Sequence, residues 1–292
     1  MWYFFEACQL AKKEKRQNVT AQPFGIGASQ LSGWLYLIIG PVYWQTKDST
    51  LALQVGIAAS FLGGFIEIIG GIAGRWIVSY VPNAALMGNM ASAGLVWLSV
   101  VGIAMVFDKP VYGLLPMLII IMDYLGKADK KFQKLPSGLI AIIVGTVIAW
   151  GGGFLTLDNF RLSFANIGFY PPKPDVFDIV AGFKGLIPFL PVILPLQINN
   201  FLSTLQGLEA AKVAGDAYPE RRSMIMDGVS TLTGALFGSP FPTSVYFGHP
   251  GWKAIDARAG FAVVNAVLYL VLCCTGLTSV LMAAIPTEAV MV

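Results

Sequence analysis

Long apolar stretches dominate this chain, and short charged segments separate them. A helix that crosses a bilayer needs about 20 mostly apolar residues. Stretches of this kind predict spans near residues 24–45, 50–74, 84–107, 111–126, 137–156, 179–206, 223–238 and 258–285. Residues 1–11 form a shorter apolar piece, interpreted as the tail of an earlier span, and the proline-rich segment 239–252 counts as a broken crossing. The pattern predicts an all-α polytopic membrane protein.

Composition agrees with a membrane protein and excludes several other classes. Hydrophobic residues make up 56% of the chain and charged residues 12%, whereas roughly 25% of residues are charged in soluble domains. The net charge of +3 is too small to indicate a nucleic-acid partner. Cys8, Cys273 and Cys274 lack CxxC spacing and are interpreted as small core residues. The chain has no DDxxD, HExxH or GxSxG motif, so we expect neither an enzyme nor a bound cofactor or metal.

The basic residues predict an orientation. If residues 12–16 are cytoplasmic and each span crosses once, most of the 19 Lys and Arg residues fall on the cytoplasmic side, among them Lys127, Lys130, Lys131 and Lys134. An excess of this kind is typical of cytoplasmic loops. We therefore expect a multi-pass protein of the cell (inner) membrane with residues 12–16 in the cytoplasm.

Two segments differ from ordinary spanning helices. Residues 23–29 (PFGIGAS) and 239–246 (SPFPTSVY) combine proline with glycine or hydroxyl residues, which favours extended backbone leading into a short helix. Extended backbone at membrane depth is tolerated where it is buried in protein or lines a cavity. Paired broken segments indicate a transporter built from inverted repeats, and we expect residues 23–28 and 240–246 to approach each other. The alternative is a pair of proline-containing surface loops.

A row of amides and hydroxyls follows the apolar part of the span near 179–206. Buried polar groups are costly unless something satisfies them, so such a row indicates a polar cavity. We assign Asn200 to a solute, followed by Gln197 and Gln206, and leave Ser203 and Gly207 to helix packing. The remaining expected solute-site residues lie in the broken segments: Phe24, Gly25, Phe241, Thr243 and Ser244. The aromatic rings could stack on a planar solute or serve packing alone.

Several motifs together resemble one transporter family. They are residues 18–25 (NVTAQPFG), 40–43 (GPVY), 200–216, Asp227-Gly228 with 233–238 (TGALFG), and 242–244 (PTS). In order and spacing they look like the xanthine/uracil/vitamin C permease family, the nucleobase/ascorbate transporters. The resemblance implies an inverted-repeat transporter of core and gate domains, with short strands in the two broken spans.

The resemblance also implies a domain division and a partial chain, truncated at both ends. Residues 1–74 would be the first-repeat part of the core domain and 75–157 the first-repeat part of the gate. Residues 158–177 would form an extracytoplasmic loop, 178–286 the second-repeat part of the core, and 287–292 the start of further gate spans.

The function that the resemblance implies is secondary active transport of a nucleobase-like or similar small polar heterocycle by core-against-gate alternating access. The expected partners are that solute, a coupling proton or sodium ion, the lipid bilayer and a second copy in a homodimer. Two alternatives stay open: a small-anion transporter of the related fold, and a non-transporting fragment.

Coupling to protons is where the sequence departs from the family. The positions that match two acidic residues of proton-coupled members hold Asn200 and either Phe247 or Gly248, and an amide cannot carry a proton. His249, the only histidine, and Glu67, inside a span, are therefore the ion-coupling candidates. Alternatively, each could have a purely structural role as a buried, hydrogen-bonded group. Asp227 is interpreted as a helix anchor, and Glu209, Asp216 and Glu220 as solvated loop charges.

Overall fold

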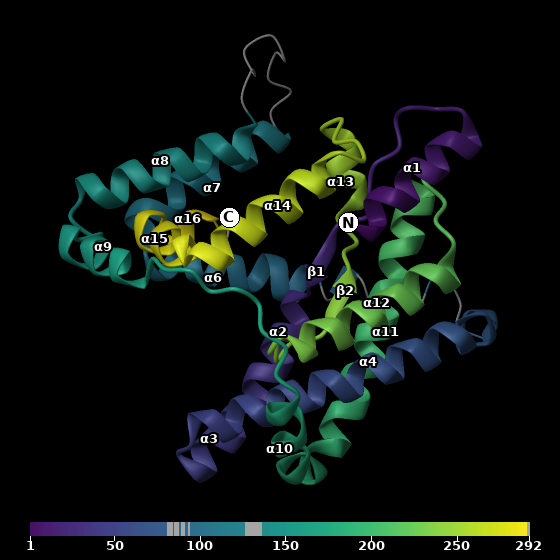
Figure 1. Cartoon of the computed structure of the whole chain (residues 1–292). Helices are drawn as coiled ribbons and strands as arrows, with labels where there is room; N and C mark the ends of the chain where they lie inside the picture. Colours follow the sequence, from purple (N-terminus) through teal and green to yellow (C-terminus); the bar gives the residue numbers. More distant parts are fainter. Residues whose placement is uncertain (81–83, 85–87, 89–90, 93, 126–135, 291–292) are drawn as a thin grey trace. The chain divides into compact units, whose positions relative to one another are not determined.

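The architecture comes from a computed structural model of the whole chain, which describes every residue except 81–83, 85–87, 89–90, 93, 126–135 and 291–292 (Figure 1). The start of the predicted span 84–107 and the four lysines of 127–134 therefore lie partly or wholly outside the described residues. The chain divides into two compact units. The first contains residues 1–92 and 172–267, and the second contains residues 93–171 and 268–292.

The first unit is helical apart from two short strands. Its elements are α1 (Trp2–Glu14), β1 (Phe24–Ile26), α2 (Ala28–Trp34), the π-helix η1 (Leu35–Ile39), α3 (Gly40–Thr46), α4 (Ser49–Tyr80), α10 (Val176–Leu186), the 3₁₀ turn η5 (Ile187–Phe189), α11 (Leu190–Val213), α12 (Glu220–Leu236), β2 (Thr243–Val245) and α13 (His249–Ala254). Helix α14 (Phe261–Thr275) begins in this unit and continues into the second. The predicted extended segments are confirmed, because β1 and β2 lie within residues 23–28 and 240–246.

Helix α4 is the centre of the first unit and packs against α10, α11 and α12. Two glycines bring α4 and α12 together: a Cβ on Gly64 would lie 2.9 Å from the Gly228 carbonyl oxygen, and a Cβ on Gly228 would lie 2.7 Å from that of Gly64. Small residues permit such backbone-to-backbone contact between membrane helices. A second part of the core joins Trp34 and Ile38 to Val55 of α4 and Ile193 of α11.

The second unit contains η2 (Gly94–Val100), α6 (Val101–Asp108), α7 (Pro110–Leu125), α8 (Ser137–Gly151), α9 (Leu157–Ser163), η4 (Phe164–Asn166), α15 (Leu277–Ala284) and α16 (Thr287–Val290). Helices α7 and α8 pack together, and α16 contacts both. The indole of Trp150 donates to the carbonyl of Ala284 at 2.9 Å, which fixes α15 to the end of α8.

Length and composition show which helices can cross a membrane. Among the described residues, Ser49–Ile72 and Val176–Val213 qualify as single stretches, and α14 with α15 qualifies as a bent pair. The predicted single span at 258–285 is therefore broken: the chain bends by 99° between α14 and α15, where Gly276 has φ 71°. A left-handed residue ends a helix because it turns the backbone away from the helical path. Many large apolar side chains, such as Ile69 and Val264, are exposed, as expected where lipid is the solvent.

Candidate functional site

The two strands form an antiparallel pair that joins the two broken segments of the first unit (Figure 1). Phe24 pairs with Val245, Gly25 with Ser244, and Ile26 with Thr243. The prolines and glycines of these segments disfavour helix, so their backbone N–H and C=O groups lack helical partners. The strand pairing supplies hydrogen-bond partners to part of them. A Cβ on Gly25 would lie 2.6 Å from the Tyr246 hydroxyl oxygen, so a larger residue here would require the Tyr246 side chain to move. The pair places residues 217 to 221 positions apart side by side.

Helix α11 passes directly beside this pair. A Cβ on Gly207 would lie 2.8 Å from the carbonyl oxygen of Val245, so the helix backbone touches β2. This close contact agrees with the interpretation of Gly207 as a packing residue. Ser203, the other residue assigned to packing, donates to the Asn199 carbonyl one turn earlier at 2.9 Å.

The amides of α11 meet a carboxylate from α4. Gln197 Nε2 donates to Glu67 Oε1 at 2.7 Å, and the Asn200 amide donates both to the same oxygen and to the Thr243 carbonyl, the latter at 2.8 Å. Glu67, Gln197 and Asn200 are at most 2% exposed. Asn200 therefore connects helix α4, helix α11 and strand β2 at one point.

A second carboxylate, Asp227 of α12, lies on the other side of Thr243. The hydroxyls of Thr204 and Thr243 donate to its two oxygens, Thr243 at 3.1 Å. Thr231 and Thr243 share a further hydrogen bond of 2.9 Å between their hydroxyls. These contacts bind α12 to α11 and β2, in agreement with Asp227 as an anchor of its helix.

Several buried polar atoms of the site have no partner among the described residues: Glu67 Oε2, Gln197 Oε1, Asn200 Oδ1 and Gln206 Nε2. Buried polar groups in proteins are nearly always hydrogen-bonded, so unpaired ones need an explanation. Two of the four atoms are amide carbonyl oxygens, which only accept, and a third is a carboxylate oxygen, which accepts when ionised. The site therefore offers acceptors to a group that carries N–H or O–H donors.

The structure brings most of the expected solute-site residues close to the strand pair. Gly25, Thr243 and Ser244 are in the ladder, and Asn200 donates to the Thr243 carbonyl. Gln197 shares the Glu67 oxygen with Asn200, and its own carbonyl oxygen lies against Gly63 of α4. Phe24 is also in the ladder and contacts the Tyr3 ring, with centroids 5.0 Å apart. Phe241 instead packs against the apolar cluster around Trp34. What these residues bind stays a prediction.

His249 belongs to a different cluster. It is fully buried, and its Nε2 lies 2.9 Å from Asp216 Oδ2. The hydrogen bonds around Glu67 do not include it, so its coupling role stays a prediction without support from this geometry.

The interpretation of Asp216 as a solvated loop charge is wrong, because its side chain is fully buried. Its Oδ1 lies 2.7 Å from both the Arg16 guanidinium and the Lys253 amine, and its Oδ2 accepts from the Thr20 amide at 3.1 Å. Burial alone would raise the pKa of the carboxyl, but the hydrogen bonds from Lys253 and Thr20 outweigh it and lower the pKa. Asp216 thus connects the segments that precede β1 and follow β2.

Comparison with known proteins gives a structural match and no match by sequence. No model of a known protein family matches the chain, and no curated protein matches it. Among solved structures, the chain is similar to the transmembrane domain of BicA, a bicarbonate transporter from a cyanobacterium, at 16% identity and a TM-score of 0.65. The match covers 99% of this chain and 78% of that one. The chain therefore has the fold of a transporter's transmembrane domain, mostly helical with short strands, and with its long apolar helices it is an integral membrane protein.

Proposed function

We propose that this chain is a secondary transporter for a small, neutral, polar solute of nucleobase-like chemistry. One observation supports the proposal: the two broken segments pair with each other next to buried amides whose oxygens have no partner among the described residues. Gln197 Oε1 and Asn200 Oδ1 lack partners in the described part of the chain, and the Asn200 amide nitrogen bonds to the Thr243 carbonyl in the pair of β1 and β2. Broken helices that meet at a polar site are typical of transporters that work by alternating access, here with a core domain moving against a gate domain.

The charge of the site favours a neutral solute with N–H donors over an anion. The hydrogen-bond network around Asn200 includes two carboxylates, Glu67 and Asp227. Neither carboxylate has a Lys, Arg or His side chain within ion-pair distance among the described residues. An anion would meet acids and amide acceptors here and no basic group, so nothing in the network would compensate its charge. A heterocycle edge could instead donate to the amide oxygens.

A small anion is the second candidate, because the solved structure that resembles this chain is from a bicarbonate transporter. Uptake into proteoliposomes separates the two. Unlabelled uracil or xanthine should compete with the uptake of a labelled nucleobase, whereas sulfate or bicarbonate should not. Competition by the anions alone would favour the second candidate, and no uptake of either class would favour a non-transporting fragment.

A further inference from the structure

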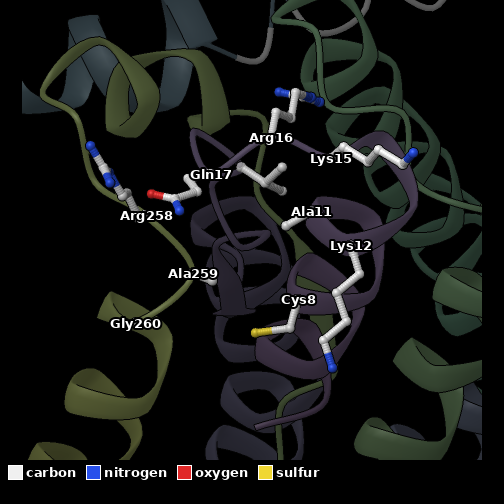
Figure 2. A pocket seen from close by; sticks show the side chains of 10 residues that line it. Cys8, Ala11, Lys12, Lys15, Arg16, Gln17, Arg258, Ala259 and Gly260 are labelled. Atoms are coloured by element: carbon white, nitrogen blue, oxygen red, sulfur yellow. The ribbon is translucent and has the colours of Figure 1, made fainter.

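A pocket of about 430 Å³ lies beside the C-terminal half of α1, in the first unit (Figure 2). Residues of α1, among them Cys8, Ala11 and Lys12, form one side, and Arg258, Ala259 and Gly260 form the other. The residues that follow α1 complete it with Lys15, Arg16 and Gln17. Small or apolar groups and Gln17 thus form the wall, and long basic side chains extend from its edge, with Lys15 directed away from Arg258 (Figure 2).

The charge of this pocket is one-sided. Among the described residues that line it, Lys12, Lys15, Arg16 and Arg258 are basic and none is acidic. A second pocket, of about 330 Å³ on another side of α1, differs in this respect, because Glu6 lines it together with Lys13 and Arg222. The one-sided charge is therefore a property of the first pocket and not of α1 as a whole.

The four basic groups are not equally available. The Arg16 guanidinium is bound to Asp216 at 2.7 Å and to the Gly215 carbonyl at 2.6 Å. Within the described ranges, the only ion pair of Arg258 is a solvent-exposed one with Asp256 at 3.5 Å, and such pairs contribute little. Lys12 and Lys15 have no carboxylate within ion-pair distance in the described part of the chain. Both are exposed, and the flexible stem of a lysine lets its amine reach an anion over a range of positions.

We propose that this pocket binds an anionic phospholipid. The phosphate would interact with Lys12, Lys15 and Arg258, and the start of an acyl chain would lie along Ala11, Val19 and Ala259. Basic pockets between the helices of membrane proteins bind anionic headgroups because the charge attraction adds to burial of the acyl chain. A free phosphate ester would gain only the first of these two contributions. The proposal does not depend on the transported solute.

The test is a titration of the full chain in neutral detergent with dioleoylphosphatidylglycerol, followed by native mass spectrometry. We expect saturable binding of this lipid and much weaker binding of dioleoylphosphatidylcholine. Each neutralised lysine should weaken binding by about fivefold, so the double variant Lys12→Gln/Lys15→Gln should lose roughly 25-fold. The charge-retaining variant Lys12→Arg/Lys15→Arg should keep the affinity and shows that the sites tolerate substitution.

The matched control is Lys13→Gln, which removes the same charge from the same helix but lines the other pocket. It should leave the affinity nearly unchanged. An equal loss in the control would overturn the proposal, because the attraction would then be diffuse. Competition by glycerol 1-phosphate at equal concentration would overturn it too, since a free phosphate ester would then account for the binding.

Discussion

Gln197 of α11 donates a hydrogen bond of 2.7 Å to Glu67 of α4, 130 positions away, where Asn200 donates to the same carboxylate oxygen. The two amides of α11 and the carboxylate of α4 thus form one hydrogen-bond network. Each amide then has its carbonyl oxygen left without a partner among the described residues. Glu67 therefore holds both amides with their nitrogen atoms toward α4.

The first prediction concerns solute binding. Asn200→Ala should weaken binding of the transported solute by roughly 1–3 kcal/mol, because one hydrogen-bonding partner of a polar edge is lost. Ser203→Ala should cost much less, since among the described residues that hydroxyl donates only to the Asn199 carbonyl of its own helix. Isothermal titration calorimetry on both variants measures the difference. Equal losses would mean that the change at Asn200 acts through folding.

The second prediction concerns ion coupling. Glu67 is hydrogen-bonded to the site amides, whereas His249 is hydrogen-bonded to Asp216. If uptake depends on pH between about 5.5 and 8, around the ordinary histidine pKa, Glu67→Gln should remove that dependence and His249→Gln should preserve it. Uptake in proteoliposomes at each pH measures this. A profile that only His249→Gln flattens would assign the coupling to the histidine, and a flat profile in all three proteins would indicate a uniporter or another driving ion.

The third prediction concerns the stability of the Asp216 cluster. Asp216→Asn should lower the free energy of unfolding by roughly 3 kcal/mol, because Arg16 and Lys253 would keep their charges without the buried carboxylate. Asp256→Asn is the control: it also removes a carboxylate, but from an exposed pair with Arg258, and it should have little effect. Thermal unfolding in detergent compares the two. Similar midpoints would show that the cluster contributes little.

The fourth prediction gives the pH range of that effect. The pKa of Asp216 is lowered in the folded protein, so its contribution is fully present above the unfolded value of about 3.9 and is lost as the pH falls through the folded value. The difference in unfolding midpoint between wild type and Asp216→Asn should therefore be constant near neutral pH and shrink below about pH 4. A difference that grows in acid would contradict this assignment.

The fifth prediction concerns the contact between α4 and α12. Gly64→Ala should destabilise the protein by about 1–3 kcal/mol, because the new methyl group would lie against the Gly228 carbonyl oxygen and force the helices apart. Gly138→Ala in α8 is the control, since a Cβ there meets nothing within 4 Å. It should leave stability unchanged or raise it slightly through the better helix propensity of alanine. Equal thermal midpoints for both variants would contradict the steric argument.

Part of the fold could be predicted because proline and glycine act locally. Pro23, Gly25 and Pro242 prevent regular helix where they stand, which indicated extended backbone in both broken segments. The register of the strand pair, with Gly25 opposite Ser244, depends on the packing of helices that are far apart in sequence. It therefore cannot be predicted from the residues of either segment alone. The break at Gly276 was missed for a related reason: glycine is common inside membrane helices, so its presence in an apolar stretch does not indicate a bend.

The sequence predicts several residues of the site, but not the hydrogen bonds and ion pairs that join them. Helical spacing placed Asn200 on a polar face, but spacing within one helix does not say which helix lies opposite, so the bonds to Glu67 were not foreseen. Asp216 was misinterpreted because it follows a span and precedes loop residues, where charges are usually solvated. Its burial depends on Arg16 and Lys253, which come from distant parts of the chain.

The glycine contact between α4 and α12 also bears on how the sequence can vary. Glu67 follows Gly64 by three positions and Asp227 immediately precedes Gly228, so both carboxylates lie within one helical turn of the point where the two backbones touch. The separation of the two backbones at this point is limited by main-chain atoms, which every residue carries. Substitutions among the exposed apolar residues of these helices would therefore leave the separation of the helices beside the two acids unchanged.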